Sequence, residues 1–380
     1  MFITDYVSWA KTVTDAPEEF LEAGALSCLS AAVGRNICLN NRIYANLWLV
    51  LLGESSIARK STAVGLARAL CEQASIPTFP DRITPESFYE NLVANPQGLF
   101  ALGELGGWLG SLARNYATGL KQDMAELYDC PPEFRRIRKD AKSRVKEFRI
   151  RHPYIVIISA STSEWFEDNI SENDAGGGFL PRFNYIIGIG REPYPVPPKL
   201  VIPNGLVETL KDIGKCSGNI TLNEKSSTYN IYVDWFNDFR VKLKEAPRTL
   251  VPFAVRLETV ALKIAILLEA QLKPTEILSE LSVESILTGC AYASRFFNNA
   301  CSVIEKLSYS SFERLCQRLY DFIVKKPGCT QRDILRTICI PKGAFQDGIS
   351  YLIESGRVNT KTPSGSRGRP TTYFYPEEER

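Results

Sequence analysis

The sequence is poor in the residues from which many catalytic centres are built. It contains one histidine, His152, which excludes metal sites made of several histidines and argues against Ser-His catalysis. Its ten cysteines are scattered without a C-x-x-C pair, and many have apolar neighbours. Buried thiols in a reducing compartment explain this usage better than disulfides or zinc ligands.

Long hydrophobic runs are also missing. No apolar stretch reaches the roughly 18 residues that a membrane-spanning helix needs. The first residues, MFITDYVSWAK, lack a basic stretch followed by a hydrophobic core, so no signal peptide is expected. We therefore expect a cytoplasmic protein with no membrane partner.

A strong overall charge is absent as well. The formal net charge of +2 means that any nucleic-acid surface must be a local patch. The 380 residues, with 44% hydrophobic and 23% charged side chains, have the composition of an ordinary soluble protein with two or three domains. No internal repeat or low-complexity segment is found.

One stretch has the pattern of a phosphate-binding loop. The apolar run 47–52 ends at Gly53, and a loop of small residues leads to Lys60 and Ser61 at the expected start of an amphipathic helix. Unpaired helix N–H groups, the helix dipole and an ammonium group would converge there on a polyphosphate. The pattern predicts an ATP site with Mg²⁺ on the hydroxyl of Ser61. The candidate nucleotide-binding residues are Gly53, Ser55, Ser56, Ala58, Arg59, Lys60, Ser61 and Thr62.

The match to the G-x-x-x-x-G-K-[ST] motif is imperfect. Six residues separate Gly53 from Lys60, where the motif has five, and Ala58 stands near the place of the second glycine. The alternative is a serine-containing turn between a buried strand and a surface helix. We favour the phosphate loop because strand, loop, Lys-Ser-Thr and helix follow one another in the order that the mechanism needs.

A second informative stretch is LFALGELGGW, residues 99–108. A P-loop ATPase carries an acidic pair at the end of a buried strand, and here Gly103 and Glu104 occupy that place. Glu104 is the candidate residue for positioning the attacking water and for holding Mg²⁺ through its hydration shell. The alternative is an exposed glutamate in a glycine turn.

The segment 135–151 is strongly basic. It contains nine Lys or Arg residues against Asp140 and Glu147, and its alternation predicts a hairpin. Such a block should bind DNA or RNA in a salt-dependent way, whereas a solvated basic face is the alternative. The candidate DNA-binding residues in it are Arg135, Arg136, Arg138, Lys139, Lys142, Arg144 and Lys146.

Polar side chains follow the next apolar strand, 154–160. Ser161, with Ser159 and Thr162, is a candidate sensor of the γ-phosphate, or these hydroxyls cap the following helix. Further on, Arg182 stands just before another strand. In a ring of P-loop subunits an arginine at this position reaches the nucleotide of the neighbour, whereas an ordinary surface arginine is the alternative.

The proline-rich segment 193–203 predicts an extended connector. Beyond it, the ranges 229–243, 252–272 and 283–307 have the periodicity of long amphipathic helices and are expected to form a helical lid. Arg256 lies on the second of these helices. It either closes over the phosphates as a catalytic residue or serves in packing and ion pairing.

The last seventy residues predict a separate winged helix-turn-helix. Helices are expected at 311–325, 330–337 and 342–355, followed by two short strands. Lys342, Gln346, Arg367 and Arg369 are the candidate contacts to duplex DNA, and protein docking is the alternative use of such a module. The predicted organisation is a helical segment 1–45, an α/β P-loop core 46–192, the lid 204–307 and the winged helix 309–380.

These residues together give a resemblance to a family. SWAKTVTDAPEEF, GRNICLNN, LLGESSIARKST, LGELGGWLGSLARNY, ELYD and GGGFLPRFNYI resemble an uncharacterised P-loop family of phage and mobile-element replication proteins, related to the minichromosome-maintenance branch of AAA+ helicases. FLPRFNYI is similar to the finger segment of that branch, and AVRLETVALKIAILLEA to its second sensor segment. The likeness implies that the basic block is a hairpin in a central pore that contacts single-stranded DNA.

We therefore expect an ATP-dependent DNA motor acting as a homo-oligomeric ring, for example a hexamer. Gly103 replaces the aspartate that the family has before its glutamate, and a Ser or Thr replaces the first-sensor asparagine. These departures support a second hypothesis, a nucleotide-gated DNA-binding initiator with little ATP turnover. A third is an assembly scaffold in which Lys60 is purely structural.

Overall fold

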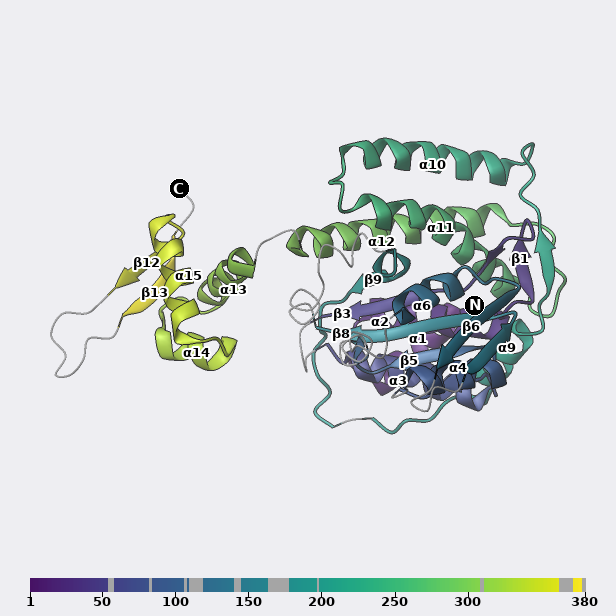
Figure 1. The fold of residues 1–380 in the computed structure, drawn as a ribbon, viewed down its shortest axis with the longest axis horizontal. Helices are drawn as coiled ribbons and strands as arrows, with labels where there is room; N and C mark the ends of the chain where they lie inside the picture. The colour runs from purple at the N-terminus through teal and green to yellow at the C-terminus, as the bar shows by residue number, and fades with distance from the viewer. Residues whose placement is uncertain are drawn as a thin grey trace. The chain divides into compact units, whose positions relative to one another are not determined.

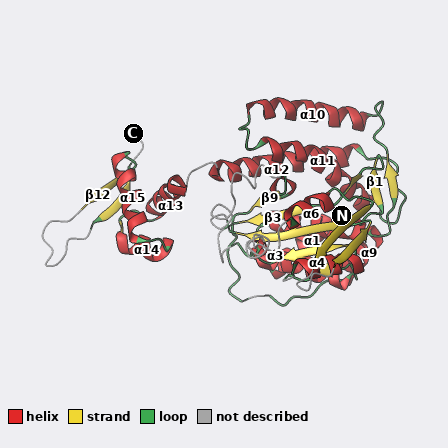
Figure 2. Cartoon of the chain, viewed as in Figure 1, coloured by secondary structure: helices red, strands yellow, loops and turns green. Residues whose placement is uncertain are grey.

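A computed structural model of the chain describes residues 1–53, 58–81, 84–105, 108, 119–139, 145–162, 178–196, 198–307, 311–361 and 372–377. The chain divides into two compact units, Met1–Ile304 and Glu305–Arg380, and each is described by itself (Figures 1 and 2). Of the helices that the structure describes, none combines the length and the hydrophobicity needed to span a membrane.

A five-stranded parallel sheet forms the centre of the first unit. The strands lie in the order β4 (Thr78–Phe79), β5 (Gln97–Leu102), β8 (Tyr154–Ser161), β3 (Trp48–Leu52) and β9 (Asn184–Ile187). β3 and β8 are buried along their whole length, as expected for parallel strands covered on both faces. The predicted α/β class is confirmed, and the arrangement is compatible with a Rossmann-like or P-loop-like α/β fold.

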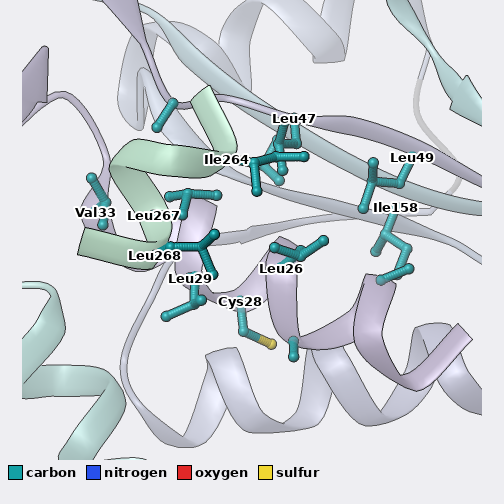
Figure 3. Packing of buried hydrophobic residues seen from close by; sticks show 14 of the residues in the cluster. Leu26, Cys28, Leu29, Val33, Leu47, Leu49, Ile158, Ile264, Leu267 and Leu268 are labelled. Atoms are coloured by element: carbon teal, nitrogen blue, oxygen red, sulfur yellow. The ribbon is translucent and has the colours of Figure 1, made fainter. Parts of the chain in front are cut away.

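One face of the sheet packs against α2 (Glu18–Val33) and α3 (Lys60–Gln73). α2 is also contacted by α1 (Phe2–Val13), α9 (Asn204–Ile213) and α11 (Val251–Leu272), which explains why it is apolar nearly all round. In Figure 3, Leu26 and Leu29 of α2 pack with Ile264 of α11 and Leu47 beside β3. The helical segment predicted at 1–45 therefore shares its core with the sheet and with the predicted lid.

That segment is not wholly helical. Residues 37–44 contain two short strands, β1 (Ile37–Leu39) and β2 (Ile43–Tyr44), which form a small sheet with β10 (Gly218–Ile220). β1 pairs with a strand far along the chain, and such a long-range partner is not visible in local periodicity.

The other face of the sheet is aromatic. Trp48 of β3 packs against Tyr128, Phe179 and Phe183 with ring centroids 5.0 to 6.0 Å apart. Tyr128 ends α6 (Leu120–Tyr128), and Phe100 of β5 stacks on Phe79 and Phe88, the latter in α4 (Pro85–Ala94). Thr84 caps α4 by accepting a hydrogen bond from the amide of Ser87.

The basic block forms the hairpin that its alternation predicted. β6 (Glu133–Lys139) and β7 (Val145–Arg151) are antiparallel, and the register pairs Arg135 with Arg149. Phe134, Phe148 and Ile150 are buried, and Tyr89 of α4 packs against both phenylalanines. One face of the hairpin therefore packs against the α/β core, and the other faces solvent.

The three long helices expected after the connector are present: α10 (Ser227–Glu245), α11 and α12 (Val283–Leu307). Figure 1 shows them stacked as a layer with α10 outermost. The connector has no helix or strand between β9 and α9 among its described residues, and it is fixed to α1 by bonds from Trp9 to the carbonyl of Val201 and from Tyr194 to that of Lys11.

The second unit contains α13 (Ser311–Lys325), α14 (Gln331–Ile338) and α15 (Lys342–Glu354), with an antiparallel sheet ordered β11 (Cys329–Thr330), β13 (Tyr373–Pro376) and β12 (Val358–Lys361). The predicted helices and the two strands at its end are confirmed; the short β11 was not predicted. Thr330 and Asp333 form a reciprocal capping box at α14. Leu319, Ile334 and Phe345 belong to a hydrophobic core of this unit.

Candidate functional site

The loop between β3 and α3 brings a lysine to the carboxyl end of the central strand. Lys60 is the first residue of α3, is largely buried, and donates a hydrogen bond of 2.7 Å from Nζ to the carbonyl oxygen of Gly53. The ammonium group therefore lies over the point where β3 ends and α3 begins. The helix dipole and the N–H groups of the first turn add to the positive potential there.

Ser61 connects this loop with the end of β5. Its hydroxyl donates to the carbonyl oxygen of Gly103 at 3.4 Å. Glu104 follows directly and is exposed. Leu102 pairs with Ser159 and Leu52 pairs with Ser161, so the ends of β5, β8 and β3 meet at one edge of the sheet. The structure thus gathers Lys60, Ser61, Glu104 and Ser161 at this carboxyl edge.

Two further contacts lie at the ends of the loop, one made by Arg59 and one between Gly53 and Ala58. Arg59 has a left-handed backbone, with φ at 47°, and its Nε lies 3.1 and 3.2 Å from the carboxylate oxygens of Asp15. A side chain at Gly53 would bring its Cβ to 3.0 Å from that of Ala58, so these two residues approach each other closely. Thr62 is exposed on α3, whereas Ser55 and Ser56 lie outside the described residues.

The two predicted catalytic arginines lie at the opposite edge of the sheet. Arg182 ends η2 (Leu180–Arg182) just before β9, whose Asn184 pairs with Leu49 of β3. The side chain of Arg182 is 8% exposed, and its Nη2 lies 2.8 Å from a carboxylate oxygen of Asp129. Its Nη1 donates to the carbonyl oxygen of Gly178. The length of β3 separates this edge from Gly53 by about 16 Å.

Arg256 joins Arg182 rather than Lys60. Its guanidinium lies 3.7 Å from the carboxylate of Asp129, so one carboxylate lies between two arginines. Burial lowers the pKa of Arg256 and the charge of Arg182 lowers it further, while Asp129 opposes the shift. The structure does not bring Arg256 over the phosphates that Lys60 of the same chain would hold.

A cavity of about 870 Å³ opens beside these arginines. Lys263, which also lines it, is 4% exposed and donates to the backbone and side-chain oxygens of Asn46 at 3.1 and 2.8 Å. Its ammonium lies 3.9 Å from the centroid of the Tyr128 ring. These contacts of Lys263 are neutral oxygens and an aromatic ring. None of them is a carboxylate that would balance the charge of the lysine.

Sequence reasoning missed Asp15, Asp129 and Lys263. The spacing of Arg256, Thr259 and Lys263 at i, i+3 and i+7 on one helix was a signal for the last of these, since such residues share a face. Asp129 carried only a weak signal, as the polar end of the ELYD motif. Asp15 carried none, because its partner Arg59 is 44 residues away.

The hairpin divides the candidate DNA-binding residues by face. Arg136 lies on the side towards the core, with Nε 3.2 Å from the buried carboxylate of Asp123. Arg135 and Arg149 lie on the solvent face and share Glu147, with their closest atoms 2.6 and 3.1 Å from its carboxylate oxygen. Lys146 pairs with Glu90. For Arg138 and Lys139 the backbone alone is described, and Lys142 and Arg144 lie outside the described residues.

In the second unit, Lys342 and Gln346 are both exposed on α15. Arg367 and Arg369 lie outside the described residues. The outer face of α15 is mixed in character, since Asp347 and Tyr351 are exposed beside them.

In the described part of the chain, no group of three or more His, Cys, Asp or Glu side chains could hold a metal ion by itself. A magnesium ion here would depend on the Ser61 hydroxyl, on Glu104 and on phosphate oxygens. Comparison of the sequence with models of known protein families and with proteins of curated function found no match.

Proposed function

We propose that the chain is an ATP-dependent DNA motor, a helicase-like replication protein that works as a homo-oligomeric ring. The observation that carries the proposal is the contact between the Ser61 hydroxyl and the carbonyl oxygen of Gly103. It joins the lysine-bearing start of α3 to the strand end that carries Glu104, and these are the two halves of an ATP-hydrolysing site.

In this proposal the loop before α3 is a P-loop. Lys60 holds the β- and γ-phosphates, and the first-turn N–H groups of α3 surround them. Ser61 would hold Mg²⁺ directly and Glu104 would hold it through a water of its hydration shell, and the bound ion would neutralise charge on the phosphates. Glu104 orients the attacking water, and Ser161, at the end of the neighbouring strand β8, is the proposed sensor of the γ-phosphate.

The position of the arginines supports the proposed ring. Arg182 and Arg256 are at the amino edge of the sheet, about 16 Å from the loop of their own chain. In this proposal both arginines contact the nucleotide bound to an adjacent copy, and Arg182 acts as the arginine finger.

DNA contact is assigned to two surfaces. The solvent face of the hairpin, with Arg135 and Arg149, grips a single strand through phosphates. The second unit has the helix and strand order of a winged helix-turn-helix, and α15 with Lys342 and Gln346 would contact duplex DNA.

The first test is ATP hydrolysis by the purified chain with and without single-stranded DNA, beside Lys60→Ala and Arg182→Ala. The proposal expects turnover that DNA stimulates and that both substitutions remove. Turnover that survives Lys60→Ala would overturn the assignment of the site.

A second function is favoured by one observation. Gly103 stands where an acidic partner of Glu104 is expected, and this fits a nucleotide-gated DNA-binding initiator that turns ATP over slowly. Tight Lys60-dependent ATP binding without DNA-stimulated turnover would support the initiator and reject the motor.

A further inference from the structure

We propose that Asp129 is an exchangeable counter-ion: it occupies an anion site at the amino edge of the sheet and is displaced when a polyphosphate enters. The site consists of Arg256 and Lys263, which line the cavity described above, and of Arg182, which pairs with Asp129. It is separate from the loop that carries Lys60. Only the source of the phosphate, an adjacent copy or free solution, rests on the proposed function.

Positive charge exceeds negative charge at this site. Arg42, Arg256 and Lys263 line the cavity, and Asp129 is the one carboxylate among its described lining residues. Arg182 adds a further cation through its pair with Asp129. Two guanidinium groups that converge on one carboxylate repel each other, and the lowered pKa of Arg256 reflects that repulsion together with burial.

The guanidinium of Arg182 has spare donor capacity. Its Nε is buried, and no hydrogen-bond partner for it is found in the described part of the chain. A buried donor without a partner is costly, and a ligand oxygen would remove that cost. A phosphate group offers several oxygens to such donors, whereas a carboxylate offers two.

Asp129 is suited to leave. Its side chain is 56% exposed, whereas Arg182 is 8% exposed, so the carboxylate can move into solvent while the arginine stays in place. Asp129 is also the residue that directly follows α6, where a small backbone rotation redirects a side chain. By contrast Lys263 is fixed by Asn46 and the Tyr128 ring, and Asn46 is held by the carbonyl of Tyr128 at 2.8 Å.

The site therefore combines two buried cations, Arg182 and Lys263, and the half-buried Arg256 with one exposed carboxylate. In the resting chain Asp129 neutralises the arginines and keeps them paired within the chain. A polyphosphate competes with it directly, so Asp129 sets the concentration at which the arginines engage. The ligand class is a polyphosphate, either the phosphates of a nucleotide bound to a second copy or a free polyphosphate.

The test measures binding of inorganic tripolyphosphate to full-length chain carrying Lys60→Ala, which removes the first phosphate site. Adding Asp129→Asn should tighten binding about tenfold, because a competing ion pair is removed. Adding Arg256→Ala instead should weaken it at least about tenfold. Asp212→Asn, which changes the net charge equally at a half-exposed ion pair with Lys215 near the end of α9, is the matched control and should have no effect.

Unchanged or weaker binding with Asp129→Asn would overturn the inference, provided that circular dichroism shows the variant folded. A second arm uses chain with Lys60 intact and measures ATP-dependent self-association by sedimentation. Stronger association with Asp129→Asn identifies a second copy as the source of the phosphate. Tighter tripolyphosphate binding without stronger association identifies a free polyphosphate as the ligand. Failure of ATP binding at Lys60 would reject the proposed function and leave the tripolyphosphate result standing.

Discussion

The hydroxyl of Ser61 donates to the carbonyl oxygen of Gly103, so the first turn of α3 contacts the glycine that directly precedes Glu104. No described atom lies within 4 Å of the Cβ position at Gly103. Among the described residues, the space beside Gly103 is therefore open, and the backbone of Gly103 is not in the left-handed region. This makes the effect of restoring an acid directly measurable.

Gly103→Asp should raise ATP turnover by about tenfold or more, because a carboxylate there can share with Glu104 the tasks of holding Mg²⁺ and positioning water. Steady-state phosphate release measures the effect. Gly65→Asp is the matched control, since Gly65 is also surrounded by open space, on the exposed side of α3. Equal turnover in Gly103→Asp and the unaltered chain would contradict the proposed role of this position.

Mixing Lys60→Ala chains with Arg182→Ala chains should restore activity that neither has alone. At equal amounts and with random assembly, about one interface in four combines an intact loop with an intact arginine, so about a quarter of the turnover should return. The measurement is ATP hydrolysis over a series of mixing ratios. A mixture that co-assembles but stays inactive would show that Arg182 does not act on a neighbouring copy.

The two faces of the hairpin should respond differently to substitution. Arg136→Ala leaves the buried Asp123 without its ion pair and should lower the free energy of unfolding by about 1–3 kcal/mol. Arg149→Ala, on the solvent face, should leave stability within about 0.5 kcal/mol but weaken DNA binding and reduce its salt slope by about one.

Chemical denaturation and DNA titrations over a range of salt concentrations distinguish these two effects. A loss of DNA affinity with Arg136→Ala at unchanged stability would reverse the assignment of faces. Equal affinities for Arg149→Ala and the unaltered chain would remove this hairpin face from the DNA surface.

Acidification should loosen the start of α12 through Glu269. Burial alone would raise the pKa of this carboxyl, but bonds from Lys273, Ser282 and Ser285 outweigh burial and lower it. A carboxyl whose pKa is lower in the folded state stabilises the fold above its ordinary value of 4.5, and the contribution is lost as pH falls through the folded pKa.

Glu269→Gln should therefore lower stability at pH 7 by about 1–3 kcal/mol and have a smaller effect below about pH 4. Thermal melts of the full chain from pH 7 to pH 3 measure both. Glu276→Gln, an exposed acid beyond the same helix, is the control. A difference between Glu269→Gln and the unaltered chain that does not shrink with acid would contradict this account.

Much of the local structure could be predicted from the sequence. The periodicity of 252–272 and 283–307 gave helices within a residue of α11 and α12, and the alternation in the basic block gave the hairpin. These features depend on neighbours two to four residues away, which a single sequence displays. The order Gly53, Lys60, Ser61 likewise gave the loop at the end of β3.

What could not be predicted depends on contacts across the chain. The pairing of Arg256 with Asp129 rather than with the loop of Lys60 is set by the packing of α11 against η2 and α2. The inward direction of Arg136 depends on which hairpin face meets α4 and α6. The ion pair of Arg256 and the direction of Arg136 are both set by tertiary packing. The pattern of basic and apolar residues along the sequence does not predict such packing.

The pair of Arg59 and Asp15 also determines how short the chain can be cut. Asp15 lies between α1 and α2, so a fragment beginning at residue 46 would lose the carboxylate that holds the left-handed residue next to Lys60. It would also expose the sheet face that α2 covers. A piece that keeps Arg59 paired with Asp15 therefore starts before Asp15, and the boundary between the two compact units lies near residue 305.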